Sequence, residues 1–80
     1  MTVQLGQGGD VELRGVCSSA EAEILLGLLL QHPGAAVDWR LCDGAHTAVV
    51  QVLAAAGRTL HGPPRDLFLR DMVEPALHRR

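Results

Sequence analysis

The sequence has no lysine, very few aromatic residues and no long hydrophobic run. Trp39 and Phe68 are its only aromatic side chains, so it offers little surface on which nucleic-acid bases can stack. All seven basic residues are arginines, and they form no basic stripe. With nine acidic residues the formal net charge is -2. This balance argues against nucleic acid and anionic membrane surfaces as partners.

Cysteine is also scarce, and the two thiols show no pattern that demands a metal or a disulfide. Cys17 and Cys42 are far apart in the sequence and lack metal-ligand spacing, and nothing in the sequence places them within bonding reach. Met1 is not followed by a signal-peptide pattern, and the apolar run at residues 24–30 is much shorter than the roughly 20 residues that cross a bilayer. We expect a cytoplasmic protein with free thiols and no membrane insertion.

Four short segments alternate apolar with polar residues, which predicts strands with one buried face. The segments are residues 2–5, 11–14, 37–41 and 66–70. In the third segment, Leu41 falls at an apolar position, which predicts that it is buried. The polar positions of the second and third strands carry charges, namely Glu12, Arg14, Asp38 and Arg40. They predict a solvated sheet face with opposite charges paired between the two strands, or alternatively a polar docking surface.

The helical segments complete a β-β-α-β-α-β-α order. The first, Ser18–Gln31, opens with a capping-box pattern in which Ser18 caps the helix and Glu21 returns the bond. A weaker helix is expected from Asp71 to the C-terminus, with Pro75 in its first turn. Because each strand has only one apolar face, the helices should cover one side of the sheet. Eighty residues make one domain, so residues 1–80 are expected to form a two-layer α/β domain with a four-stranded mixed sheet.

The second predicted helix, Ala45–Ala56, is the most informative segment. Gly57 closes it, and Asp43 or Gly44 is expected to cap its start. Its inner face should join the core. The stretch from Val37 to Gly57, VDWRLCDGAHTAVVQVLAAAG, joins this helix to the third strand.

This stretch and the order of elements resemble a STAS domain, the fold of bacterial anti-sigma-factor antagonists and of the small STAS subunit of phospholipid-transport ABC complexes. The resemblance covers about residues 11–69. The family has a strand pattern (V/L)D(L/F)S, which Val37, Asp38 and Trp39 match and from which Arg40 departs. A second family pattern, D(S/T)(A/S)G, falls on residues 46–49.

Within the second pattern, Thr47 takes the place of the phosphorylated residue and Ala48 is typical, whereas His46 replaces an aspartate and Val49 a glycine. The resemblance implies a non-catalytic regulatory module of a partner-switching circuit, with Thr47 as a candidate phosphoacceptor. The alternative implied by the same family is a constitutive accessory subunit bound to an ABC ATPase. For Thr47 itself, an unmodified interface residue and a simple helix cap are the other interpretations.

The predicted partner-binding surface is the start and outer face of the second helix. Thr47, Gln51 and Arg58 are spaced to share one face. The full set of candidates is Asp43, His46, Thr47, Val50, Gln51, Ala54 and Arg58. A short helix with few charges is the structural alternative.

The first predicted helix is apolar almost all round its circumference. One side must face the sheet, and the remainder is covered either by the second helix or by another chain, including a second copy.

Neither a metal site nor a catalytic site is expected. Cys42 and His46 straddle a turn and lack further ligands at usable spacing. A Cys–His nucleophile pair is not expected either, because an 80-residue chain with so few polar residues has little room for a substrate pocket. We expect a non-enzyme without cofactors.

Overall fold

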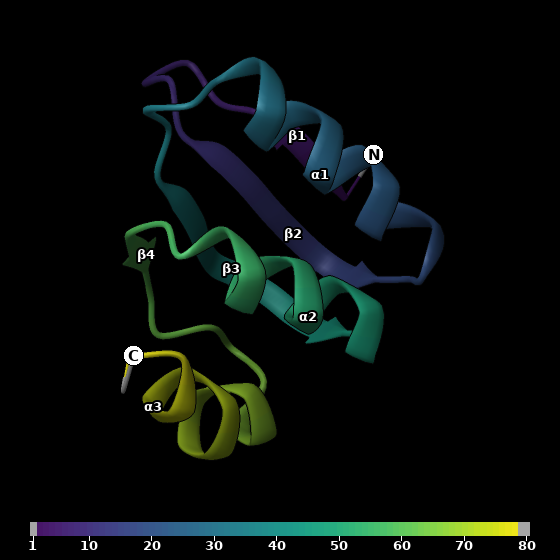
Figure 1. The fold of residues 1–80 in the computed structure, drawn as a ribbon. Coiled ribbons are helices and arrows are strands. Elements are labelled where there is room, and N and C mark those ends of the chain that lie inside the picture. Colours follow the sequence, from purple (N-terminus) through teal and green to yellow (C-terminus); the bar gives the residue numbers. More distant parts are fainter. Residues whose placement is uncertain (1, 79–80) are drawn as a thin grey trace.

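The computed structural model describes residues 2–78, and the predicted fold class is confirmed. Figure 1 shows one α/β domain built from a four-stranded mixed sheet and a helical layer. In chain order the elements are β1 (Val3–Leu5), β2 (Val11–Cys17), α1 (Ala20–Gln31), β3 (Val37–Ala45), α2 (Thr47–Ala56), β4 (Leu60–His61), the π-helical turn η1 (Leu69–Val73) and α3 (Glu74–Leu77).

The strands lie in the sheet in their order along the chain, β1-β2-β3-β4. β1 runs antiparallel to β2, whereas the β2–β3 and β3–β4 pairs are parallel. The antiparallel pair is joined by the glycine-rich turn at residues 6–10, and the parallel pairs require the helical crossovers α1 and α2. Both crossovers lie side by side on the same face of the sheet (Figure 1).

The core lies between this face and the two helices. Trp39 and Leu13 point inward from the middle strands and are fully buried. Leu25 and Leu29 of α1 pack against them, and so does the inner face of α2, which covers the same face of the sheet. The predicted inner face of α2 is confirmed in its centre, since its residues Val49 and Leu53 are buried.

β3 is irregular, and this irregularity reverses one prediction. Arg14 pairs with Leu41 although Glu12 pairs with Asp38, so β3 contains one residue more than β2 over this stretch. Such a bulge changes which side chains face inward. Leu41 is therefore 38% exposed and Cys42 is fully buried, so the prediction of a buried Leu41 was wrong.

The solvated sheet face carries the predicted charges, but they pair differently from the prediction. The Arg14 guanidinium lies 3.0 Å from Glu12, and that of Arg40 lies 2.7 Å from Asp38. Each pair is formed within one strand, two residues apart on the same face. The parallel register sets Glu12 beside Asp38, so a pair between these positions would join like charges.

The C-terminal part differs most from the prediction. Residues 66–70 do not form a strand: helical structure runs from Leu67 to Leu77, with η1 at its centre. Asp66 starts this segment, since its Oδ2 accepts a hydrogen bond of 2.9 Å from the backbone N–H of Leu69. The fourth strand is the two-residue β4, which pairs with the beginning of β3. The predicted third helix thus begins earlier than Asp71, and its last two residues lie outside the described range.

The start of α1 also differs from the prediction. The capping box does not form, because the residue before the helix is Ser19, in helical geometry and without a side-chain cap bond. The Ser18 carbonyl instead accepts from the backbone N–H of Glu21 at 3.0 Å. α1 therefore begins through backbone hydrogen bonds, two residues later than predicted.

Candidate functional site

The junction between β3 and α2 is a tight corner built around His46. β3 continues through Ala45, and the backbone N–H of His46 donates to the carbonyl of Cys17 at the end of β2, at 2.9 Å. His46 has extended geometry, and its Nδ1 accepts a hydrogen bond of 3.0 Å from the backbone N–H of Ala48. This side chain satisfies one of the free donors in the first helical turn.

His46 is therefore the cap of α2, and the prediction of Asp43 or Gly44 was wrong. Both predicted residues lie within β3, where Gly44 pairs with Val16 of β2. The strand is longer than the alternating pattern indicated, and it delivers the chain directly to the helix. Since His46 supplies the cap, the Thr47 hydroxyl is not needed for that role.

Thr47 is the first residue of α2 and is exposed to solvent. The first turn of α2 contains no acidic residue. The helix start thus presents a hydroxyl group in a region where free N–H groups and the helix macrodipole favour negative charge.

Asp43 lies just before this corner and is exposed. Its carboxylate is 3.8 Å from the guanidinium of Arg65, an ion pair at the surface. The loop carrying Arg65 is held in place by its backbone, because the N–H groups of Arg65 and Asp66 both donate to the carbonyl of Cys42, at 3.0 and 3.3 Å. This loop therefore lies against the end of β3.

The outer face of α2 is flanked by the C-terminal helical segment. Gln51 is exposed, while Val50 and Ala54 are half-buried. Gln51 and Ala54 line a shallow depression of about 510 Å³ together with Ala76 and Leu77. These last two residues were not predicted to lie here, because the sequence of a C-terminal helix does not by itself reveal which neighbouring helix it packs against.

Arg58 does not continue the α2 stripe. The helix ends at Ala56, and Gly57 takes a left-handed conformation with φ 62°, which turns the chain. The Arg58 guanidinium then reaches the end of α1. Its Nη1 donates to the carbonyls of His32 and Ala35 at 3.0 and 2.9 Å, and its Nη2 donates to the carbonyl of Leu29 at 2.8 Å.

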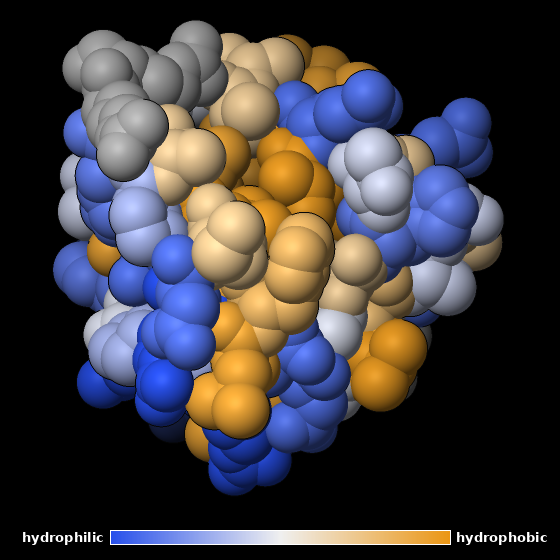
Figure 2. Space-filling model, turned by 90° about the horizontal axis from the view of Figure 1, so that it is seen from below, coloured by the Kyte–Doolittle hydropathy of each residue, from blue (hydrophilic) through white to orange (hydrophobic). Residues whose placement is uncertain are grey.

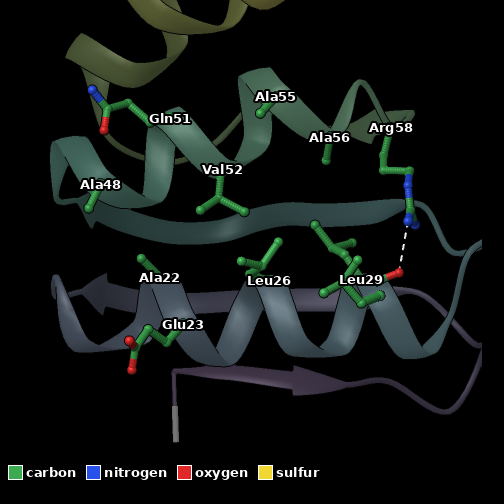
Figure 3. A pocket seen from close by; sticks show the side chains of 11 residues that line it. Ala22, Glu23, Leu26, Leu29, Ala48, Gln51, Val52, Ala55, Ala56 and Arg58 are labelled. Atoms are coloured by element: carbon green, nitrogen blue, oxygen red, sulfur yellow. Dashed lines mark hydrogen bonds between the residues drawn. The ribbon is translucent and has the colours of Figure 1, made fainter.

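A groove of about 570 Å³ runs between α1 and α2 (Figure 3). Its lining is mostly apolar, with Leu26 and Leu30 on the α1 side and small side chains such as Ala48 and Ala55 on the α2 side. Leu30 is 71% exposed. The excess of leucines on α1 is evident from the sequence, but the groove that they border is not.

A second exposed apolar region lies on the C-terminal helical segment. Figure 2 views the molecule from this side and shows apolar residues gathered across the surface. Large exposed side chains here are Leu67, Phe68 and Met72. The prediction of a strand at residues 66–70 had assigned Leu67 to a buried face.

The two cysteines were predicted to be free. They are free and buried, and they lie close to each other in the core. Cys42 lies opposite Gly15, which has no side chain, and Cys17 is the next inward-facing residue of β2. The neighbouring Cys42 thiol lowers the pKa of Cys17 to about 7, while the Cys17 thiol together with burial raises the pKa of Cys42. The Cys42 thiol donates its proton to the carbonyl of Gly44 at 3.3 Å.

Within residues 2–78, no group of three or more His, Cys, Asp or Glu side chains is arranged to hold a metal ion. No helix in the described chain is long and apolar enough to span a membrane.

Comparison of the chain with protein-family models, with curated proteins and with solved structures found no match.

Proposed function

We propose that the chain is a non-catalytic regulatory module that binds a partner protein through the start and outer face of α2. The proposal combines the resemblance to STAS anti-sigma-factor antagonists with the exposed position of Thr47 at the first residue of α2. That position is the single observation on which the proposal depends.

The cap arrangement supports a signalling role for Thr47. Because His46 caps the helix, the Thr47 hydroxyl is available to a kinase or a partner without loss of the cap. A phosphate here would add about -1.5 to -2 charges at a helix start, where negative charge is favoured. The charge of the surface would change strongly while the fold stayed intact, which is what a binding switch requires.

The surroundings of Thr47 suit a protein partner. Four of the candidate residues are exposed polar residues within a short stretch of the chain, namely Asp43, His46, Thr47 and Gln51. Val50 and Ala54 add half-buried apolar surface. Arg58 was a candidate for the same surface. We leave it out of the proposed contact because its guanidinium binds the carbonyls at the end of α1.

The alternative is a constitutive accessory subunit of an ABC-type transport complex. It is favoured by the residues next to Thr47, since His46 and Val49 replace the aspartate and glycine of the family pattern. A subunit that is never phosphorylated would not need a neighbouring acid for recognition by a kinase.

The test is a partner titration. A tagged chain isolates the partner from its native cell, and binding of the purified partner is then measured for wild type, Thr47→Asp and Thr47→Ala. We expect Thr47→Asp to weaken binding at least about tenfold, or 1.4 kcal/mol, because a charge is placed inside the contact. Thr47→Ala should bind nearly as wild type does.

Thr59→Asp is the matched control, since Thr59 is exposed but lies beyond α2. It should not change binding. If Thr47→Asp binds as tightly as wild type, the start of α2 is not the contact surface. A partner that is an ABC ATPase, together with an unmodified intact mass for protein taken from the cell, would favour the constitutive subunit.

A further inference from the structure

The groove between α1 and α2 has opposite charges at its two ends. Figure 3 shows the two helices running in the same direction along its sides. Glu23 lies at the end where both helices begin, and Arg58 lies at the end where both finish. The lining residues between them are uncharged. The groove therefore has a negative end and a positive end, and the two charges of its lining residues sum to zero.

The exposed leucines of this groove are adjacent. Leu26 and Leu30 are one helical turn apart on α1, and Leu30 is among the most exposed large apolar side chains of the described residues. On the other side, the small side chains of Ala48 and Ala55 allow another backbone to approach closely. Neighbouring exposed leucines beside an alanine-lined helix form a surface suited to helix–helix packing.

We infer that this groove is the self-association surface of the protein, and that its occupant is the same groove of a second copy. A half-turn about an axis that crosses the groove near Leu26 brings α1 of one copy antiparallel to α1 of the other. The same rotation sets Glu23 of each copy against Arg58 of the other. A two-fold contact of this kind forms both ion pairs at once.

Arg58 can take part without giving up its role at the end of α1. A guanidinium has five N–H donors, and three hydrogen bonds are made to the carbonyls of Leu29, His32 and Ala35. The remaining donors are available for a carboxylate. The antiparallel arrangement is also favourable for the helix macrodipoles, because the acidic first turn of one α1 meets the arginine-capped end of the other.

This surface goes beyond the proposed function, since Thr47 is not among the groove-lining residues. Self-association is measured on the purified chain without any partner, so its failure would not affect the partner titration. A failed partner titration would likewise leave the self-association result unchanged.

The experiment is sedimentation equilibrium over a wide range of protein concentration. We expect the mass to rise from that of one 8.5 kDa chain to that of two. Leu30→Glu should remain monomeric, because it replaces an apolar side chain inside the contact with a charge. Leu67→Glu is the control: Leu67 is 62% exposed on the C-terminal segment, and its substitution should leave the dimer intact. Circular dichroism checks that both variants are folded.

A second pair of variants tests the orientation of the two copies. Glu23→Arg places two arginines together at each end of the groove and should weaken self-association at least about tenfold. Asp71→Arg reverses a charge outside the groove and should have little effect. A chain that stays monomeric at all concentrations, or a dimer that is lost in Leu67→Glu but retained in Leu30→Glu, would overturn the inference.

Discussion

Trp39 and Glu74 are joined by a hydrogen bond of 3.0 Å, in which the indole Nε1 donates to Oε2 of the carboxylate. Trp39 belongs to the centre of the sheet and is fully buried, whereas Glu74 begins α3. Gly62 lies against both atoms, so that a side chain at this position would collide with the pair. This bond fastens the C-terminal helical segment to the core.

Glu74→Ala should therefore lower the free energy of unfolding by about 1–3 kcal/mol, because it leaves a buried N–H group without its acceptor. Urea denaturation followed by tryptophan fluorescence measures the loss, and Trp39 is the only tryptophan in the chain. The conservative variant Glu74→Gln keeps an oxygen acceptor and should lose less. Equal losses in the two variants would show that the hydrogen bond is not what stabilises this contact.

The Trp39–Glu74 link also illustrates what the sequence can and cannot predict. Burial of Trp39 follows from its alternating strand, and that prediction is confirmed. Its polar partner is 35 residues away in the C-terminal helical segment, whose contact with the core the sequence did not predict. A pairing of this kind depends on the tertiary placement of a short helix, and neither residue carries a local signal for it.

The misassigned segment has a physical explanation. Residues 66–70 alternate over too few positions for period two to be distinguished from a helical period. Asp66 was the better signal, since an aspartate before an apolar run is a common helix start, and in the structure it accepts from Leu69. The true fourth strand has only two residues, Leu60–His61, too few to form any recognisable pattern.

At the candidate site the sequence predicted a strand followed by a helix, together with the exposed position of Thr47, but β3 continues through the predicted turn to Ala45 and α2 begins two residues later than predicted, at Thr47. The sequence did not predict the identity of the cap. Histidine is not among the preferred cap residues, and His46 takes this role because β3 extends as far as Ala45. The groove between α1 and α2 also required the structure, because its shape depends on how the two helices are spaced on the sheet.

Arg58 should be more important for stability than the other exposed or half-exposed arginines. Its three hydrogen bonds satisfy backbone carbonyls at and beyond the end of α1. We expect Arg58→Ala to lower the free energy of unfolding by about 2 kcal/mol or more, since a hydrogen bond to a charged group contributes about 1.5–3 kcal/mol. Thermal or urea denaturation measures this loss.

Arg65→Ala is the matched control for Arg58. Arg65 makes a surface ion pair with Asp43 at 3.8 Å, and its loss should cost less than about 1 kcal/mol. If the two variants are equally stable, the contacts of Arg58 with α1 contribute nothing beyond those of an ordinary surface arginine.

The Asp38–Arg40 pair predicts a specific dependence of stability on pH. Side-chain hydrogen bonds from Arg40 hold the pKa of Asp38 below its ordinary value. A carboxyl group whose pKa is lowered by folding stabilises the native state above its unfolded pKa of about 3.9, and this contribution is lost as the pH falls through the folded pKa. Arg40→Ser should therefore be slightly less stable than wild type near neutral pH and equal to it in strong acid.

The expected difference near neutral pH is less than about 1 kcal/mol, because the pair is at the surface. Leu13→Ala is the contrasting core variant. It should lose about 2–5 kcal/mol at every pH, since the lost packing does not depend on charge. Urea denaturation at several pH values gives both comparisons. A constant difference between Arg40→Ser and wild type down to strong acid would contradict the assignment to Asp38.

The final prediction concerns the neighbouring thiols of Cys17 and Cys42. The Cys42 thiol lowers the pKa of Cys17 to about 7, and the Cys17 thiol helps to raise that of Cys42. Wild type should thus form one thiolate near neutral pH and keep the second thiol protonated while the chain remains folded, as ultraviolet thiolate absorbance would show. Because the folded pKa of Cys17 is lowered, this thiolate stabilises the fold above the unfolded thiol pKa, and the contribution is lost as the pH falls through about 7. Cys42→Ala removes the largest of the interactions that lower the pKa of Cys17, so this pKa should rise and the titration near neutral pH should be lost.

Two thiols that titrate together near the ordinary cysteine pKa of about 8.5 in the folded chain would show that the two groups do not influence each other.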